Sequence, residues 1–338
     1  MRSVRSDYLL LLITSLTCAP AIASDESSLS FAIDNDALFR VDYDYTNGLF
    51  LSFATGRIAP DALLSPLSLS SNENTALDKF ELVLGHKMYT PSDLDAAVPL
   101  ANDRPYAGVL YGEVNYISLQ AEHSHRYNLT LGTTGKHSLA EQAQNVVHDM
   151  TDFSQPRGWA YQIDDTFVAN IGYLHHSNLW RDNTTTGIDW ELSNISEVNA
   201  GNFRSDVSTG LMLRWGADLA NNMGAANIDN ENPFRASMLG ESSEGWFVFT
   251  GIKVRYRFND ITIEGERSEV TRYAQLEGED PSLYDVRLEP VQAFAVAGFA
   301  WYHQDFGITL TTTIKTPDYK HAPDNLYGTG ALSLYVFF

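Results

Sequence analysis

Cysteine is almost absent from this chain of 338 residues, which carries a single one, Cys18. Cys18 lies within residues 1–23, which have the features of a secretory signal, so we expect it to be removed during export. The mature chain then has no thiol. This excludes disulfide bonds, cysteine metal ligands and a cysteine nucleophile from the mature protein.

Long hydrophobic runs and basic residues are also scarce. No apolar stretch reaches the ~18 residues that a membrane-spanning helix needs, which excludes a helical membrane protein. The chain has 22 Lys and Arg residues against 43 Asp and Glu residues, a formal net charge of -21. We therefore expect no nucleic-acid partner, because phosphate binding depends on Lys and Arg. Acidic loops beside an anionic lipid surface would need divalent cations between them.

Two further absences bear on organisation and chemistry. No Pro- or Ser-rich linker and no helical repeat divides the chain, so residues 24–338 are expected to form one domain. The Gly-x-Ser-x-Gly motif that carries the nucleophile of many ester hydrolases does not occur. A serine hydrolase of that type is therefore not indicated.

The secretory signal at residues 1–23 has three recognisable parts. Arg2 and Arg5 supply the positive start, residues 9–13 form a short apolar core, and Ala21-Ile22-Ala23 is a small-residue cleavage site. The mature chain is expected to begin at Ser24.

Aromatic residues are frequent, with 17 Tyr, 17 Phe and 6 Trp, and many short segments alternate between apolar and polar residues. In residues 252–258, apolar side chains alternate with Lys253, Arg255 and Arg257. This period of two is typical of a strand between lipid and a polar lumen. Similar segments occur at residues 29–33, 49–53, 80–84, 109–119, 190–195, 211–215, 246–249, 294–301 and 306–314. They predict an all-β chain folded as a transmembrane antiparallel β-barrel.

The last residues of the chain look like the C-terminal strand of bacterial outer-membrane proteins, which the barrel-insertion machinery recognises. Residues 332–338 alternate, and the terminal Phe338 closes the strand. The last strand of a soluble sandwich is the alternative, but the signal and the missing cysteines favour the outer membrane. We expect both termini in the periplasm. Residues 58–78 and 221–245 are predicted to be loops.

An acidic segment joins the first two predicted strands, at residues 37–44. It places four polar side chains near one strand end, namely Asn35, Asp36, Asp42 and Asp44. Carboxylates beside amides and hydroxyls suit a hard divalent cation. A polar hairpin tip accounts for the same residues, because Asn, Asp and Gly are ordinary turn residues.

Residues 138–150 have a helical period. The apolar stripe consists of Leu139, Ala143 and Val146 or Val147. Ser138 and Glu141 fit a capping box, which predicts a helix start near Ser138. Such a helix in a loop outside the barrel would form a groove against the wall.

Gln144 and His148 are four residues apart and therefore share one face of this helix. From its position alone, His148 reads as a surface histidine. His123 and His125 near a turn, and the pair at residues 175–176, are interpreted as structural or solvated.

Several motifs in the same order resemble the outer-membrane lipid A 3'-O-deacylase family, the LpxR-like proteins. They are Asn35-Asp36, Tyr45-Thr46-Asn47-Gly48, Tyr89-Thr90-Pro91, Asp103-Arg104-Pro105-Tyr106-Ala107-Gly108, Leu131-Gly132, Gln144 with His148, and Gly158-Trp159. The resemblance runs from about residue 28 to the end. It implies twelve antiparallel strands and a short helix in an extracellular loop.

The resemblance also implies the reaction, which is hydrolysis of the ester that links the 3' acyloxyacyl group to lipid A in the outer leaflet. It points to His148 as the base and reverses the surface reading of that residue. Water activated by His148 is the favoured nucleophile, and a Ser or Thr hydroxyl paired with His148 is the alternative. We expect Ca2+ or a similar divalent cation as cofactor, and a monomeric enzyme.

The remaining candidate residues follow from the same motifs. Asp36 is the first choice as a metal ligand and Asp44 the second, with backbone carbonyls completing the oxygen shell. Asn35 would orient the ester carbonyl or donate to the oxyanion. Thr46 and Gln144 would hold water, substrate or His148.

One departure concerns lipid recognition. Some members of the family carry basic residues after the Tyr-x-Pro segment, whereas residues 92–99 contain no Lys or Arg in this chain. Two other functions compete with the deacylase, namely a different outer-membrane phospholipase or acyl hydrolase and a non-enzymatic porin-like barrel. The pair Asn35-Asp36 and a helix-borne His148 favour an enzyme.

Overall fold

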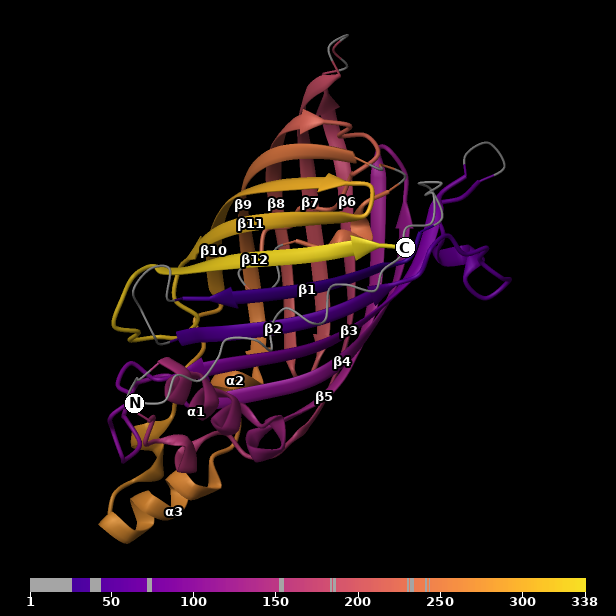
Figure 1. Ribbon diagram of the computed structural model, residues 1–338. Coiled ribbons are helices and arrows are strands. Elements are labelled where there is room, and N and C mark those ends of the chain that lie inside the picture. Colours follow the sequence, from indigo (N-terminus) through magenta and orange to yellow (C-terminus); the bar gives the residue numbers. More distant parts are fainter. Residues whose placement is uncertain are drawn as a thin grey trace, which may run out of the picture.

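Twelve strands form one closed antiparallel barrel in the computed structural model, which describes residues 26–36, 44–71, 75–151, 155–182, 184, 187–229, 231, 234–240, 242 and 244–338 (Figure 1). Each strand pairs with its neighbours in sequence, and β1 pairs with β12 to close the ring. The strands are β1 Ser28–Asn35, β2 Asp44–Ala54, β3 Leu77–Thr90, β4 Ala107–Leu119, β5 His123–Thr134, β6 Phe167–Arg181, β7 Ile188–Gly201, β8 Arg204–Ala217, β9 Glu244–Asp260, β10 Val291–His303, β11 Phe306–Lys315 and β12 Tyr327–Phe337. The predicted twelve-stranded barrel is confirmed. The predicted signal at residues 1–23 lies outside the described residues.

The alternation in β9 has the physical basis predicted for it. Ile252 is 63% exposed on the outer face, whereas Lys253 and Arg255 are 2% and 4% exposed and face the lumen. Because successive strand residues point to opposite faces, one sequence period produces an apolar outside and a charged inside.

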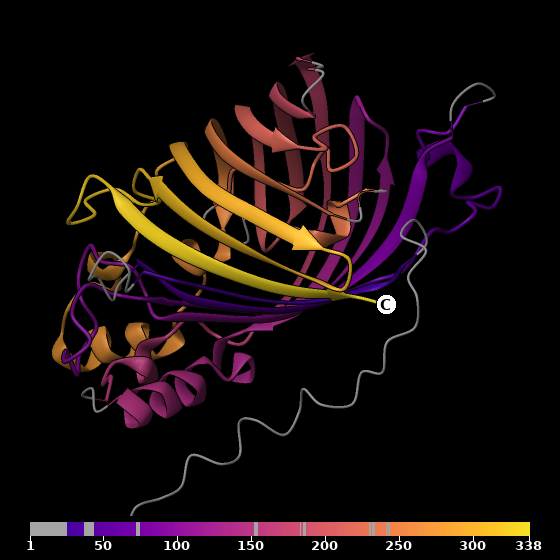
Figure 2. The same ribbon diagram turned by 45° about the horizontal axis from the view of Figure 1, so that its top comes forward.

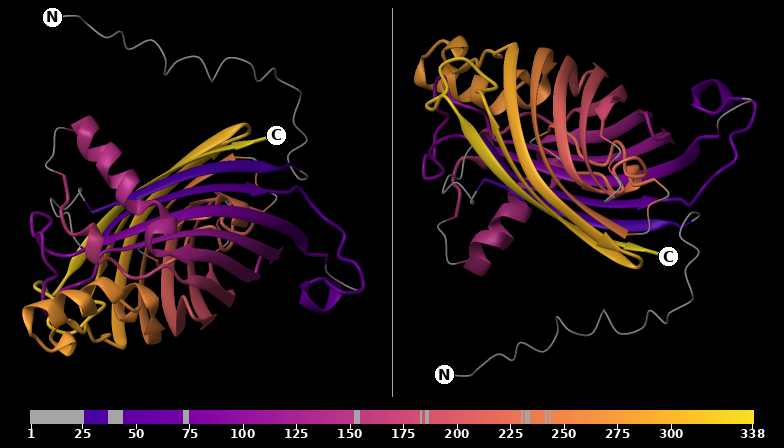
Figure 3. Two further views of the ribbon diagram at one scale, coloured as in Figure 1. Left: turned by 90° about the horizontal axis from the view of Figure 1, so that it is seen from below. Right: turned by 90° about the horizontal axis from the view of Figure 1, so that it is seen from above.

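The two ends of the described chain meet at one end of the barrel, which we call the terminal end (Figures 2 and 3). The amide of Ser27 donates to the carbonyl of Phe338 at 2.9 Å, and the amide of Phe338 donates to the carbonyl of Ser27 at 3.0 Å. In β12, Leu334 is 47% exposed and Tyr335 is 2% exposed, as the C-terminal pattern predicted.

The opposite end, here called the distal end, carries the helices (Figures 1 and 3). They are α1 Ala140–Thr151, α2 Ile261–Glu264 and α3 Ser268–Glu277, with the 3-10 turns η3 Gly135–Ser138, η4 Trp159–Tyr161 and η6 Pro281–Tyr284 nearby. Two other 3-10 turns, η2 Ser65–Leu67 and η5 Ala236–Met238, belong to connections that start from the terminal end. None of the described helices is long and apolar enough to cross a membrane.

The connection between β8 and β9 folds back into the barrel, and we call its described residues between 218 and 240 the lumen segment. Ile228, Phe234 and Leu239 are almost fully buried there, and the ring of Phe234 stacks on that of Tyr335 at a centroid distance of 5.4 Å. The prediction of a loop at residues 221–245 is therefore confirmed up to the start of β9. The loop predicted at residues 58–78 lies in the connection from β2 to β3, although its residues 77–78 already belong to β3.

Candidate functional site

The helix α1 begins two residues later than the capping pattern predicted. Residues 135–138 form the 3-10 turn η3, and Leu139 adopts a left-handed conformation with φ of 61° before the helix starts at Ala140. The hydroxyl of Ser138 donates to the carbonyl of Gly135 at 2.6 Å and accepts from the amide of Ala140 at 3.4 Å. Ser138 therefore stabilises the turn that leads into the helix.

The predicted apolar stripe of this segment is divided, because Ala143 packs against buried side chains whereas the two valines face outward. Val146 and Val147 are 57% and 54% exposed, whereas Gln144 and His148 are 3% and 5% exposed. The shared face predicted for Gln144 and His148 is confirmed, and it is the buried face. A surface helix that buries two polar side chains and exposes two valines departs from the usual pattern, in which polar residues face the solvent.

Trp159 determines how α1 sits on the wall. Its indole Nε1 donates to Oε1 of Gln144 at 2.7 Å, and its ring packs against Tyr106 with a centroid distance of 4.7 Å. Met88 of β3 and Ala140 of α1 complete this apolar cluster. Nε2 of Gln144 is buried and has no hydrogen-bond partner among the described residues. The amide of Gln144 is thus oriented at one end and available at the other.

Strand alternation separates the side chains at the start of the acidic segment. The Tyr45 hydroxyl donates to Oδ1 of Asp34 at 2.6 Å, and both side chains are buried on the lumen side. Asn35 therefore faces outward, opposite Asn47 in the register of β1 and β2. The amide of Asp36 donates to the carbonyl of Thr46 at 3.4 Å.

A bulge in β2 brings Thr46 to the same region. The register of β2 and β3 shifts between Tyr45 and Asn47, and Oγ1 of Thr46 lies 2.7 Å from Oγ1 of Thr90. Met88, opposite Asn47, belongs to the cluster that holds α1. Asn35, Asp36 and Thr46 thus lie at or next to the distal ends of β1 and β2, and α1 packs against the neighbouring strand β3 (Figures 1 and 3). Asp42 lies outside the described residues.

Asp44 is directed elsewhere. Its Oδ1 accepts from Arg104 at 2.6 Å, and its Oδ2 lies 2.7 Å from Nζ of Lys315. Both cations also contact Asp318, and all four side chains are buried. The geometry gives Asp44 an ion-pairing role in the lumen, on the other face of the wall from Asn35.

The donor chemistry of the described residues fits a cation only in part. Asp36 offers a carboxylate that is 3% exposed, which suits a hard cation bound through oxygen. The carboxylate of Asp44 is already neutralised by two cations and would have to leave both to bind a metal. Within the described ranges, no three His, Cys, Asp or Glu side chains are grouped to hold a metal ion.

Trp159 and Arg104 make structural contacts that the sequence did not indicate. Trp159 was visible only as part of a motif, and its bond to Gln144 depends on the fold. Arg104 contacts Asp44, Asp318 and the hydroxyl of Thr262, and it stacks on Tyr89 at 4.4 Å. Arg104 therefore stabilises the distal end of the barrel.

The four histidines that the sequence analysis interpreted as structural or solvated lie on β5 and β6. His176 is buried in β6, with Nε2 at 2.7 Å from the hydroxyl of Ser193. His123, His125 and His175 lie in contact on β5 and β6, and the rings of His125 and His175 are 4.8 Å apart.

Comparison with known proteins identifies a family and solved structures that are similar to this chain. The sequence model of the family described as "Outer membrane protein LpxR" matches residues 9–338. The solved structure of LpxR from Salmonella typhimurium has a TM-score of 0.75 at 16% identity, covering 92% of this chain and 100% of that chain. The beta domain of the Bordetella autotransporter BrkA is much less similar, with a TM-score of 0.42 at 11% identity over 93% and 98% of the two chains.

A search of curated proteins finds no match. The match to the family model nevertheless spans nearly the whole chain, and the solved LpxR structure shares its closed barrel. The chain therefore belongs to the LpxR family of outer-membrane proteins.

Proposed function

We propose that this protein hydrolyses the ester that links the 3' acyloxyacyl group to lipid A, with His148 as the base. The observation that carries the proposal is the orientation of α1. Gln144 and His148 are buried against the wall, while Val146 and Val147 face outward. Membership of the LpxR family supports a lipid A deacylase in the outer membrane.

The proposed orientation in the membrane follows from the barrel. A barrel with an even number of strands keeps both termini on one side, which is the periplasm in bacterial outer-membrane proteins. The distal end then faces outward, with α1 outside the wall at the level where strands give way to loops. A lipid whose acyl chains stay in the membrane would reach the buried face of α1 past its apolar residues.

The proposed reaction is attack by water on the ester carbonyl carbon. His148 takes a proton from the water, and the bond between the carbonyl carbon and the 3' oxygen breaks after the tetrahedral intermediate has formed. The protonated imidazole returns the proton to the departing 3' oxygen. The products are a lipid A with a free 3' hydroxyl and the released acyloxyacyl acid.

Neighbouring residues would position these groups. The outward amide of Asn35 is proposed to donate to the oxyanion, and the unpartnered Nε2 of Gln144 to hold the water or the substrate. The bond from Trp159 restricts the rotation of the Gln144 amide. Thr46 and Thr90 would keep the start of β2 in place.

We propose Ca2+ or a similar divalent cation as cofactor, with Asp36 as its carboxylate ligand and backbone carbonyls as further ligands. When bound, such a cation would polarise the ester carbonyl. Asp44 is left out of this ligand set because Arg104 and Lys315 occupy its carboxylate.

The lumen argues against the porin-like alternative. Glu231 of the lumen segment accepts from Lys87 and Tyr89, both at 2.8 Å, and from Arg204 at 2.6 Å. These bonds tie the segment to β3 and β8 across the inside of the barrel. A filled lumen does not suit a diffusion channel.

The test is mass spectrometry of lipid A from cells that do or do not express the protein. We expect loss of the mass of the 3' acyloxyacyl group only in expressing cells, and no loss with His148→Ala. Unchanged lipid A in cells that hold correctly inserted wild-type protein would overturn the proposal. Loss of an acyl group from phospholipids instead would support the phospholipase alternative.

A further inference from the structure

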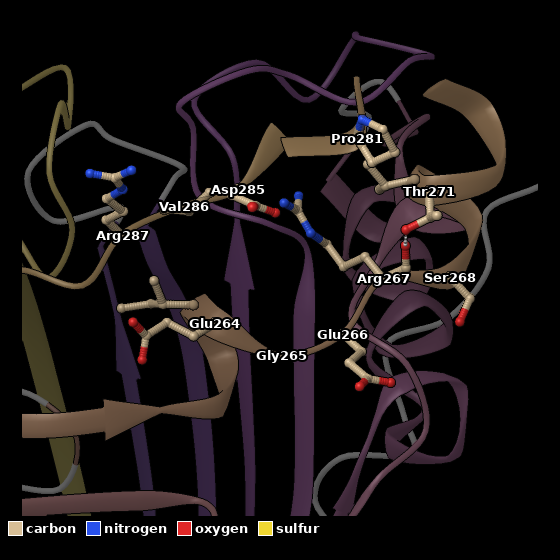
Figure 4. Close-up of a pocket in the computed structure, with 12 residues that line it drawn as sticks. Glu264, Gly265, Glu266, Arg267, Ser268, Thr271, Pro281, Asp285, Val286 and Arg287 are labelled. Atoms are coloured by element: carbon tan, nitrogen blue, oxygen red, sulfur yellow. Dashed lines mark hydrogen bonds between the residues drawn. The ribbon is translucent and has the colours of Figure 1, made fainter. Parts of the chain in front are cut away.

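A pocket of about 590 Å³ lies at the distal end, in the connection between β9 and β10, apart from the site at α1 (Figure 4). It is lined by residues of α2, α3 and η6 and by residues 285–287. The proposed reaction uses none of these residues, so the pocket needs a separate explanation.

The walls of the pocket belong to two packed clusters. Ile263 and Val286 line it and pack with Leu288 and Tyr319. On the other side, Val270 packs with Ala274 and Tyr284 in a cluster that includes Tyr161 and Tyr273. The guanidinium of Arg267 also donates to the carbonyl of Tyr284. The shape of the pocket is therefore held before any ligand binds.

The polar groups in the pocket are mixed in character. Figure 4 shows Arg267 and Asp285 directed toward the middle of the pocket, with Arg287 and Glu264 on one side. On the other side, the hydroxyl of Thr271 donates to the carbonyl of Arg267 at 3.4 Å, and the hydroxyl of Ser268 donates to Asp164 and points away from the pocket. Guanidinium groups only donate hydrogen bonds, and ionised carboxylates only accept them.

This mixture discriminates between classes of ligand. A simple anion would meet the carboxylates, and a simple cation would meet the guanidinium groups. A sugar, whose hydroxyls each donate and accept, can satisfy both kinds of group at once. We propose that this pocket binds a sugar unit of the lipopolysaccharide oligosaccharide. The statement that this sugar belongs to the substrate rests on the proposed function.

The pocket is connected to the segment that orients α1. The ring of Tyr273 on α3 contacts that of Tyr161 at 5.6 Å, edge to face, and Tyr161 ends the turn η4 that begins with Trp159. Three residues after Tyr161, the amide of Asp164 donates to the carbonyl of Glu266 at 2.8 Å. A sugar held here would therefore be placed at a constant position relative to Gln144.

A sugar subsite would also compensate for the lipid contacts that are missing because residues 92–99 contain no Lys or Arg. Without a cation in that loop, the headgroup needs another point of attachment on the outer side. The oligosaccharide extends away from the membrane, toward the loops of the distal end. Contacts to it would add affinity for the substrate without changing the chemistry at the ester.

The first experiment measures binding of the oligosaccharide released from lipopolysaccharide by mild acid, using the full-length protein in detergent and calorimetry. We expect Arg287→Ala and Asp285→Asn each to weaken binding by about ten-fold, the loss that one charge-assisted hydrogen bond produces. The matched control is Arg272→Ala, because Arg272 is an exposed arginine of α3 outside the pocket. Absence of binding, or equal binding by all variants, would overturn the proposal.

The second experiment compares deacylation of complete lipopolysaccharide with that of lipid A lacking the oligosaccharide. For complete lipopolysaccharide, we expect Arg287→Ala and Asp285→Asn to raise KM by about ten-fold and to leave kcat unchanged. For lipid A without the oligosaccharide, we expect neither KM nor kcat to change. A rise in KM for both substrates would contradict a sugar subsite. Oligosaccharide binding that depends on Arg287, in a protein without deacylase activity, would support the pocket while the proposed reaction fails.

Discussion

The indole of Trp159 donates a hydrogen bond of 2.7 Å to the side chain of Gln144, and both residues are almost fully buried. This contact joins η4 to α1 and fixes the direction in which the helix presents His148. It also leaves Nε2 of Gln144 as a buried donor that has no hydrogen-bond partner among the described residues. A single bond between two loop elements thus orients the proposed machinery.

Trp159→Phe tests this contact because it keeps the ring packing against Tyr106 but removes the donor. We expect kcat to fall by about three- to ten-fold, the worth of one net hydrogen bond, with little change in KM. Steady-state deacylation of lipid A by purified protein measures this effect. The control is Trp190→Phe, at an exposed tryptophan of β7. A Trp159→Phe enzyme with a normal kcat would show that the bond does not position Gln144.

His148→Ala should reduce kcat by about 10²- to 10⁴-fold, the usual contribution of a positioned base. The barrel should still insert and resist protease, because a residue of a loop helix adds little to barrel stability. His148→Gln should not restore the rate, since an amide does not accept the proton. The control is His137→Ala, whose side chain is 76% exposed in the turn before α1. Normal hydrolysis by folded His148→Ala protein would remove His148 from the mechanism.

The nature of the nucleophile has a separate readout in the same experiment. Attack by water leaves no covalent intermediate, whereas a Ser or Thr nucleophile forms an acyl-enzyme. Intact-mass measurement of enzyme quenched during turnover should therefore show only the unmodified chain. An added acyl mass would support the Ser or Thr alternative.

Removal of divalent cations should abolish deacylation, and Ca2+ should restore it. Asp36→Ala should behave like the chelated wild-type enzyme while the barrel remains folded, because we assign the carboxylate ligand to Asp36. Activity assays across a range of free Ca2+ would show this. Asp149→Asn, an exposed acid on α1, serves as the control. Full activity in excess chelator would exclude a cation from the reaction.

Asp44→Asn should destabilise the barrel by about 3–5 kcal/mol, because it leaves Arg104 and Lys315 buried beside one fewer carboxylate. Adding Lys315→Met should recover part of this loss. Thermal unfolding followed by gel migration measures both changes. An Asp44→Asn protein of normal stability that needs more Ca2+ would favour a metal ligand role for Asp44.

The same cluster predicts how stability depends on pH. Burial alone would raise the pKa of Asp318, but Lys315, Arg257 and Arg104 hold it well below the usual value. A lowered carboxyl pKa stabilises the fold above the unfolded value of about 4, and this contribution is lost as the pH falls further. We therefore expect the unfolding temperature to drop below about pH 4, and to drop less for Asp318→Asn.

The lumen segment should make the protein non-conducting in planar bilayers. Its contacts through Glu231 and Phe234 fill the space that a porin leaves open. Glu231→Ala should loosen the segment and produce brief conductance steps, because Lys87 and Arg204 then lose a buried partner. Steady porin-like conductance by the wild-type protein would contradict the filled lumen.

The sequence by itself determined the class of fold and the two faces of the strands whose alternation it shows, but not β5 His123–Thr134 and β6 Phe167–Arg181. The alternation at residues 252–258 and the final strand depend only on a period of two, which is a local property of the chain. The shared face of Gln144 and His148 follows in the same way from the helical period. A local period fixes how neighbouring side chains are arranged relative to one another.

The tertiary structure decided which way those faces point. The helical period does not say that Gln144 and His148 are buried while Val146 faces outward, because that depends on Trp159 and on Met88 of β3. The partition of Asp34 to the lumen and Asn35 to the outside depends on where the barrel closes.

Asp44 is the clearest example of a residue whose role the sequence alone does not determine. In the sequence it is one more acid in a short acidic segment, and a metal site is the natural hypothesis. In the barrel its carboxylate meets Arg104 from the connection after β3 and Lys315 from the end of β11. Partners so distant in sequence become neighbours only when the sheet closes, so no local pattern encodes the pairing.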